Sequence, residues 1–342
     1  MQDDLFGAPP PVPPPEPAPR QRGLGIAPVE YDPALRALAA RLLPRLRLGG
    51  SSWSYPGWQG LVWEGEHSEA QLAKNGLPVY AQHPLLRTVS LDRSFYRPLS
   101  ASQYARYAAQ VPDDFRFVVK APSLVTDALV RAEDGKGRAP NPAFLDPALA
   151  LQEFVQPAIE GLGHKIGALV FQLSPLPWQM LDRLPQQLQR LRDLLGSLPP
   201  LPHEGIYAVE VRDPEWIAPD LAHVLRDTRA TYCLGLHAKL PPIEDQLPLL
   251  RALWPTPLVC RWNLHPVHGP YGYEDAEKLY APYDRIHHPA PETHAVLART
   301  IAGITGAGQN ALVTISNHAE GCAPLTVRTL AEQVAAQPSA AP

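Results

Sequence analysis

The chain has 342 residues, of which 45% are hydrophobic, and this composition predicts a globular protein with a large core rather than a disordered chain. Its formal net charge of −4 argues against general nucleic-acid binding, and no apolar run approaches the ~20 residues that span a membrane. The three cysteines are widely spaced, which predicts reduced thiols. The N-terminus lacks the basic residues and apolar stretch of a secretory signal, so we expect a cytoplasmic protein.

The first part of the chain is rich in proline, which accounts for 42 of the 342 residues. Residues 8–19 read APPPVPPPEPAP, so we expect residues 1–44 to form a flexible, extended tail and residues 337–342 a disordered end. Near the start, Gln2 to Phe6 (QDDLF) resembles the short peptide that docks onto the bacterial sliding clamp. Five residues carry little information, and a chance match is the competing interpretation.

Eight short β-like runs follow, separated by segments with helical patterns. They span residues 46–52, 87–95, 115–121, 165–173, 205–212, 231–237, 257–264 and 311–318. This alternation predicts one α/β domain over residues 45–336, a (β/α)8 barrel of the TIM type. A doubly wound open sheet has the same alternation and is the alternative.

The segments between the strands carry helix start and stop signals. Asp146 and Pro147 supply a cap and a first-turn proline before an apolar stretch that ends in glycine. Residues 219–230 and 274–286 have amphipathic spacing. Internal prolines at 157, 248 and 282 are expected to kink or shorten helices.

Polar residues recur at the carboxyl ends of the eight runs, where barrels place their functional groups. Glu210 and Arg212 lie two residues apart and so share one face of a strand, pointing into the barrel mouth. The cations Lys120, Arg212 and Arg261 outnumber the carboxylates Asp92 and Glu210. This surplus of positive charge suits a carboxylate or phosphate ligand. The alternative is that these charges pair with their neighbours and merely fill the end of the barrel.

Two segments beside the expected mouth have more than one interpretation. Residues 51–60 place Trp53, Tyr55 and Trp58 around a Pro-Gly turn, either as an aromatic wall of the site or as a packed loop. Residues 130–144, punctuated by glycine and proline, form either a lid that brings cations to a substrate or a plain solvated loop.

A cofactor is not predicted, although a divalent metal ion stays possible. His237, His265 and His318 are the weak candidates for its ligands, because no compact metal-binding motif is present. Lys120, at the end of an apolar strand, is expected to act as an anion-binding ammonium, with Schiff-base chemistry as the alternative.

Several motifs, taken together and in order, resemble those of the YecE-like proteins, also called domain of unknown function 72. They are LGGSSWSYPGW, LDRSFYRP, FRFVVKAP, LVFQLSP, YAVEVRDPEW and ISNHAEGCAP. The resemblance covers about residues 46–335 and implies a TIM-type barrel, but no established activity. The positions that match the family's motifs are Ser52, Trp53, Tyr55, Trp58, Asp92, Tyr96, Lys120, Glu210, Arg212, Trp216 and Asn317.

These observations predict an enzyme of the hydrolase or isomerase type that acts on a small anionic or sugar-like substrate. Glu210, Asp92 and Lys120 are the expected catalytic groups. The other motif residues, together with Arg261, are expected to bind the substrate. The first alternative is a non-catalytic ligand-binding or adaptor protein recruited through its tail, and the second is a metal-dependent phosphoesterase or nuclease.

Overall fold

A computed structural model of the chain describes residues 25–131 and 137–338. Gln2 to Phe6, the predicted clamp-docking peptide, lies outside the described residues, as does the run of prolines at 8–19. Docking onto the sliding clamp therefore stays a prediction from sequence.

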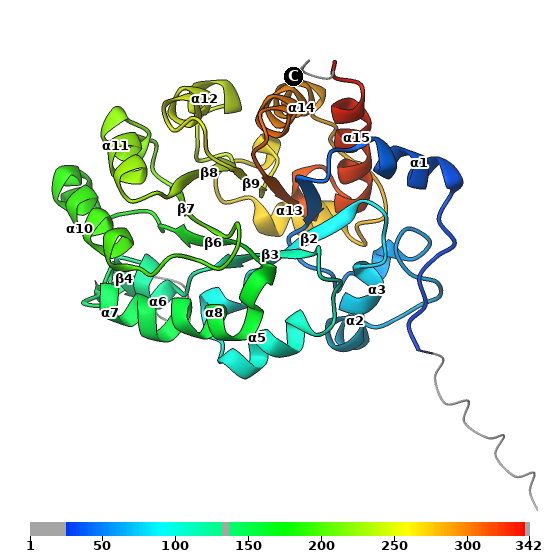
Figure 1. The fold of residues 1–342 in the computed structure, drawn as a ribbon, viewed down its shortest axis with the longest axis horizontal. Helices are drawn as coiled ribbons and strands as arrows, with labels where there is room; N and C mark the ends of the chain where they lie inside the picture. The colour runs from blue at the N-terminus through cyan, green and yellow to red at the C-terminus, as the bar shows by residue number, and fades with distance from the viewer. Residues whose placement is uncertain (1–24, 132–136, 339–342) are drawn as a thin grey trace, which may run out of the picture.

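Eight parallel strands close into a barrel at the centre of the molecule (Figure 1). In order around the barrel they are β1 (Leu46–Gly50), β10 (Ala311–Ile315), β9 (Leu258–Trp262), β8 (Thr231–Leu236), β7 (Ile206–Glu210), β6 (Ile166–Gln172), β3 (Arg116–Lys120) and β2 (Leu86–Leu91). Each lies within one of the eight predicted runs or starts one residue before it. The closed barrel confirms the predicted fold class and excludes the doubly wound sheet.

Helices surround the barrel and cover the outer faces of its strands (Figure 1). The longer ones include α5 (Ala101–Ala108), α10 (Leu184–Ser197), α11 (Pro219–Asp227), α12 (Ile243–Ala252), α13 (Tyr273–Tyr280), α14 (Pro291–Gly306) and α15 (Ala323–Ala335). The shorter ones include α2 (Glu69–Asn75), α3 (Leu77–Tyr80), α4 (Arg93–Tyr96), α6 (Ser123–Thr126), α7 (Pro147–Ala150), α8 (Gln156–Leu162) and α9 (Trp178–Leu181). Because the strands are apolar on both faces, this outer layer shields them from water.

The helix signals read from the sequence act as expected. The Asp146 side chain accepts a hydrogen bond from Leu149 N at the start of α7, and the helical stretch ends at Gly163, whose φ of +54° suits glycine. Between α7 and α8, residues Leu151–Val155 form a π-helical turn just before Pro157. Pro282 follows the end of α13, as expected of a proline that shortens a helix, whereas Pro248 lies inside α12, which continues through it.

Residues 130–144, expected to be a lid or a solvated loop, contain a small antiparallel pair of strands. They are β4 (Leu129–Arg131) and β5 (Gly137–Pro140), and the connecting residues 132–136 lie outside the described part of the chain. The end of β4 is fixed to the barrel rim, because Asp127 binds Arg131 and also accepts a hydrogen bond from Leu129 N.

Part of the segment that we expected to be a flexible tail is folded. Helix α1 (Pro33–Arg41) is capped by the Asp32 side chain and lies beside α15 (Figure 1). Arg41 donates a hydrogen bond to the backbone oxygen of Ala335, and Leu38 is buried. Ordered structure therefore begins earlier than the proline content of the tail suggests.

The three cysteines are buried and unpaired, as their spacing predicts. Within the described residues, no helix combines the length and the apolar character that crossing a membrane requires.

Candidate functional site

The mouth cavity, of about 630 Å³, opens at the carboxyl ends of the barrel strands. It is lined by strand ends and by the loops that follow them, which is where barrels with this topology bind their ligands. Its lining includes Ser51, Ser52, Tyr55, Asp92, Phe95, Tyr96, Lys120, Gln172, Arg212, His237, Lys239, Arg261, Asn263, Tyr271, Tyr273, Ser316 and His318.

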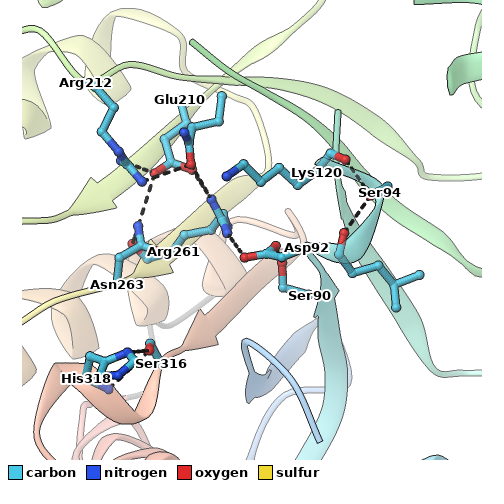
Figure 2. A network of polar contacts seen from close by, with 12 residues as sticks. Ser90, Asp92, Ser94, Lys120, Glu210, Arg212, Arg261, Asn263, Ser316 and His318 are labelled. Atoms are coloured by element: carbon cyan, nitrogen blue, oxygen red, sulfur yellow. Dashed lines mark hydrogen bonds and ion pairs between the residues drawn. The ribbon is translucent and has the colours of Figure 1, made fainter. Parts of the chain in front are cut away.

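Glu210, the last residue of β7, lies beneath this cavity and is fully buried. Its Oε1 accepts hydrogen bonds from Arg212 and from Asn263 Nδ2 (3.1 Å), and its Oε2 accepts one from Arg261 Nη1 at 2.6 Å (Figure 2). Both carboxylate oxygens therefore have charged or amide donors, supplied by residues at or just after the ends of β7 and β9.

Arg261, from β9, joins the two carboxylates of the site. One terminal nitrogen binds Glu210 and the other binds Asp92 Oδ2 at 2.6 Å (Figure 2). Asp92 is fixed on its other oxygen by Ser90 Oγ at 2.5 Å, and about a third of its side chain is exposed. Gln172 adds an acceptor for both Arg261 and Arg212.

The electrostatics of this network hold Glu210 and Arg261 in their charged forms. Burial alone would raise the pKa of Glu210, but the charges of Arg212 and Arg261 lower it to about 2. Burial alone would lower the pKa of Arg261, but Asp92 and Glu210 raise it above its usual range. Glu210 is consequently ionised at neutral pH and has no proton to give as a general acid.

Lys120, the last residue of β3, extends into the cavity toward Glu210 and Arg261 (Figure 2). Its Nζ lies 3.5 Å from the centre of the Phe95 ring. Among the described residues, the Lys120 amine has neither an ion pair nor a hydrogen bond. Burial lowers the pKa of Lys120 to about 7. The negative charge of Asp92 raises this pKa and the positive charge of Arg261 lowers it, but burial has the largest effect.

Many of the residues expected from the sequence do line the mouth cavity. They are Ser52, Tyr55, Asp92, Tyr96, Lys120, Arg212, His237, Arg261 and His318. The structure also brings Glu210 and Arg212 together on one face, as their spacing predicts.

Four other expected residues lie in the interior and do not line the cavity. Trp58 is fully buried, stacks on Trp63 and donates from Nε1 to Asn317 Oδ1 at 3.2 Å. Asn317 Oδ1 also accepts from Ala323 N, at the start of α15. Trp53 and Trp216 are buried in the same core. For the loop at 51–60, the structure therefore combines both interpretations, because Tyr55 lines the cavity while its tryptophans pack inside.

The three candidate metal ligands do not converge. His237 accepts a hydrogen bond from Lys239 N, His265 accepts one from Val267 N, and His318 contacts Ser316 and Tyr283. Within residues 25–131 and 137–338, no three His, Cys, Asp or Glu side chains form a group suited to a metal ion. The metal-dependent alternative thus has no ligand set in the part of the chain that is described.

Some lining residues were not among those expected from the sequence as site residues. Lys239 and Tyr271 come from the loops after β8 and β9, and Tyr273 is the first residue of α13. Lys239 Nζ lies 4.1 Å from the centre of the Tyr271 ring. Lys239 follows the end of a barrel strand by only a few residues, and this position was an available signal. Phe95, which supports Lys120, sits between motif residues that were noted.

Comparison with known proteins gives one family and several structures. Residues 47–342 match the family model described as "Protein of unknown function DUF72". No curated protein is similar enough in sequence to match the chain.

The solved structures that resemble this chain are distant in sequence. A DUF72 family protein from Enterococcus faecalis V583 is 18% identical with a TM-score of 0.55, covering 86% of this chain and 96% of its own. A DUF72 family protein from Thermotoga maritima MSB8 is 19% identical with a TM-score of 0.52, covering 84% of this chain and 97% of its own. At these identities the likeness supports the fold alone.

Proposed function

The chain belongs to the DUF72 family of proteins of unknown function, and we propose that it is an enzyme that binds a small anionic substrate in the mouth cavity and acts on it at Lys120. This family assignment agrees with the resemblance inferred from the motifs. Because the family has no established activity, the proposal rests on the residues of the mouth cavity alone.

The observation that carries the proposal is an excess of positive charge around the cavity. Lys120, Arg212, Lys239 and Arg261 line it, whereas Asp92 is the one carboxylate in its described lining and Glu210 lies beneath. Both carboxylates are bound to Arg261, and Arg212 also binds Glu210. The two lysines have no carboxylate partner among the described residues, so the cavity has a net attraction for an anion.

The same network favours some reaction types over others. Hydrolysis by a pair of carboxylates needs one that donates a proton and one that stays free. Glu210 and Asp92 are both engaged by one guanidinium, and Glu210 has no access to the cavity. A reaction of the isomerase type, centred on the Lys120 amine, therefore suits this site better than carboxylate-driven hydrolysis.

The test is titration of the purified protein with inorganic phosphate at low ionic strength, followed by calorimetry. We expect binding by the unmodified protein and affinity about tenfold lower for Lys120→Met, since a hydrogen bond to a charged group contributes about 1.5–3 kcal/mol. Added salt should weaken the binding, because it screens the attraction between charges.

Lys74→Met is the matched control, because Lys74 lies exposed on α2, outside the cavity lining. Its affinity for phosphate should equal that of the unmodified protein. Equal losses in both variants, or no phosphate binding by the unmodified protein, would refute the anion site.

A further inference from the structure

Lys120 differs from the two arginines of the mouth cavity because, among the described residues, its amine has no ion pair and no hydrogen bond, and its side chain is half-buried at the end of β3. Arg212 and Arg261 bind Glu210, Asp92 and Gln172, while Lys120 Nζ lies 3.5 Å from the centre of the Phe95 ring. A lysine kept only for structure would be expected to use its donors in hydrogen bonds, as Lys165 does with two backbone oxygens. The Lys120 side chain instead lies in the lining of the mouth cavity, with its amine against the Phe95 ring.

The surroundings of this amine also favour its uncharged form. Burial lowers the pKa of Lys120 to about 7, so that a large share of the molecules carries a neutral amine at neutral pH. An exposed lysine is almost fully protonated there, and only the neutral amine has the electron pair that attacks a carbon atom.

We infer that Lys120 condenses with the carbonyl carbon of an anionic aldehyde or ketone and forms a Schiff base in the mouth cavity. The substrate class is an oxo acid or a phosphorylated carbonyl compound. The anionic group would face the other cations that line the cavity, Lys239 and Arg212, and the carbonyl group would face Lys120. The inference rests on the proposed function, because it uses the same cavity and the same class of anion.

The chemistry of this step needs no further reactant. The amine nitrogen forms a bond to the carbonyl carbon, and the electrons of the C=O double bond move to oxygen. Two protons leave the nitrogen and join that oxygen, which departs as water when the C=N double bond forms. The imine then takes up one proton from solvent, and addition of water reverses the whole sequence.

The test uses glyoxylate, a small anionic aldehyde, with sodium cyanoborohydride to reduce any imine to a stable amine. Peptide mapping by mass spectrometry then compares the rate of labelling at each lysine of the unmodified protein. At pH 7 we expect Lys120 to be labelled about tenfold faster, or more, than the exposed Lys74. Labelling of Lys120 no faster than that of Lys74 would overturn the inference.

Two further measurements separate a reactive amine from a merely accessible one. The labelling rate at Lys120 should level off above pH 7, whereas the rate at an ordinary exposed amine keeps rising toward pH 10. Lys120→Arg keeps the positive charge but cannot form the imine, so it should lose the fast label, while Lys74→Arg, outside the cavity lining, retains it. Because the main comparison is made within the unmodified protein, misfolding of a variant does not remove the test.

Acetaldehyde, which has no charge, distinguishes failure of this inference from failure of the proposed anion site. Faster labelling of Lys120 by glyoxylate than by acetaldehyde, together with inhibition by inorganic phosphate, supports both. Fast labelling by both aldehydes without inhibition supports the reactive amine and rejects the anion site. Slow labelling by both aldehydes rejects the Schiff base, and the phosphate titration then decides the anion site separately.

Discussion

Glu210 organises the mouth of the barrel through its two carboxylate oxygens. It is fully buried, and its partners Arg212 and Arg261 carry the groups that face the cavity. Its removal would leave two guanidinium groups buried beside each other with reduced compensation, which is more costly than losing an exposed pair. We therefore propose that Glu210 acts as a positioning residue, while the acid or base role expected from the sequence stays a prediction.

The first prediction concerns Glu210→Gln, which keeps the size of the side chain and removes its charge. We expect the free energy of unfolding at pH 7 to fall by about 3–5 kcal/mol, the usual effect of breaking a buried ion pair. The difference should shrink as the pH falls from about 4.5 toward about 2. In the folded protein the pKa of Glu210 is lowered from its ordinary value of 4.5 to about 2. The stabilisation by its charge is therefore fully present above pH 4.5 and is lost as the pH falls toward 2.

Urea denaturation followed by circular dichroism at several pH values measures this difference. Glu274→Gln, on the exposed side of α13, is the control and should have little effect at any pH. A loss below about 1 kcal/mol for Glu210→Gln, or a loss that does not depend on pH, would contradict the ionised network.

At this scale the sequence predicts positions better than roles. The two-residue spacing of Glu210 and Arg212 correctly places them together, because strand geometry alone determines it. Trp58 and Tyr55 lie three residues apart on one loop, yet one is in the core and the other lines the cavity. Only tertiary packing decides between them, and aromatic residues suit both environments.

Among the elements, the junction of β1 and β2 depends on one tyrosine of α3. Tyr80 OH donates to Thr88 O at 2.8 Å and accepts from Gly50 N at 2.6 Å, where the register of the two strands shifts. Gly49 permits this approach, since a Cβ there would lie 1.8 Å from Thr88 O. The Tyr80 hydroxyl thus bridges the backbone nitrogen of Gly50 in β1 and the backbone oxygen of Thr88 in β2.

The second prediction is that Tyr80→Phe lowers the free energy of unfolding by about 1–3 kcal/mol. The change leaves a buried backbone donor and a buried acceptor without a partner, and such groups carry the full cost of desolvation. Thermal unfolding followed by calorimetry measures the loss. Tyr107→Phe is the control, because among the described residues its hydroxyl has no hydrogen bond, and an equal loss in both variants would contradict the bridging role.

The sequence predicts barrel strands well and peripheral elements poorly. Each barrel strand is a short apolar run bounded by turn residues, and this pattern is clear in a single sequence. Strands β4 and β5 contain glycine, proline and charged residues, which are uncommon in strands, so their pairing cannot be read from composition. Helix α1 follows a proline-rich tail, and its amphipathic pattern is too short to stand out.

At the scale of the whole molecule, residues 25–44 contact two parts of the fold that are far apart in the sequence, the segment after β1 and the last helix, α15. Glu64 N donates to Ala27 O, and the Tyr31 hydroxyl donates to Val62 O. Helix α1 then lies beside α15 near the end of the chain. This segment therefore belongs to the folded unit, although the barrel strands begin only at Leu46.

The third prediction compares two shortened chains, one starting at residue 25 and one at residue 45. Only the second loses the buried Leu38 and Tyr31, and we expect its free energy of unfolding to be lower by about 2 kcal/mol or more. Urea denaturation of both proteins measures the difference. Equal stability of the two would contradict the packing of α1.

Closure of the barrel has a consequence for the order in which the protein is made. Strand β1 pairs with β10, so one edge of β1 stays open until residues 311–315 have left the ribosome. Until then, the growing chain exposes unpaired strand backbone that neighbouring chains can join. The mouth cavity, with walls that run from Ser51 to His318, is complete only at the same moment. Protection from aggregation and competence to bind a ligand are therefore gained together, in the last stage of synthesis.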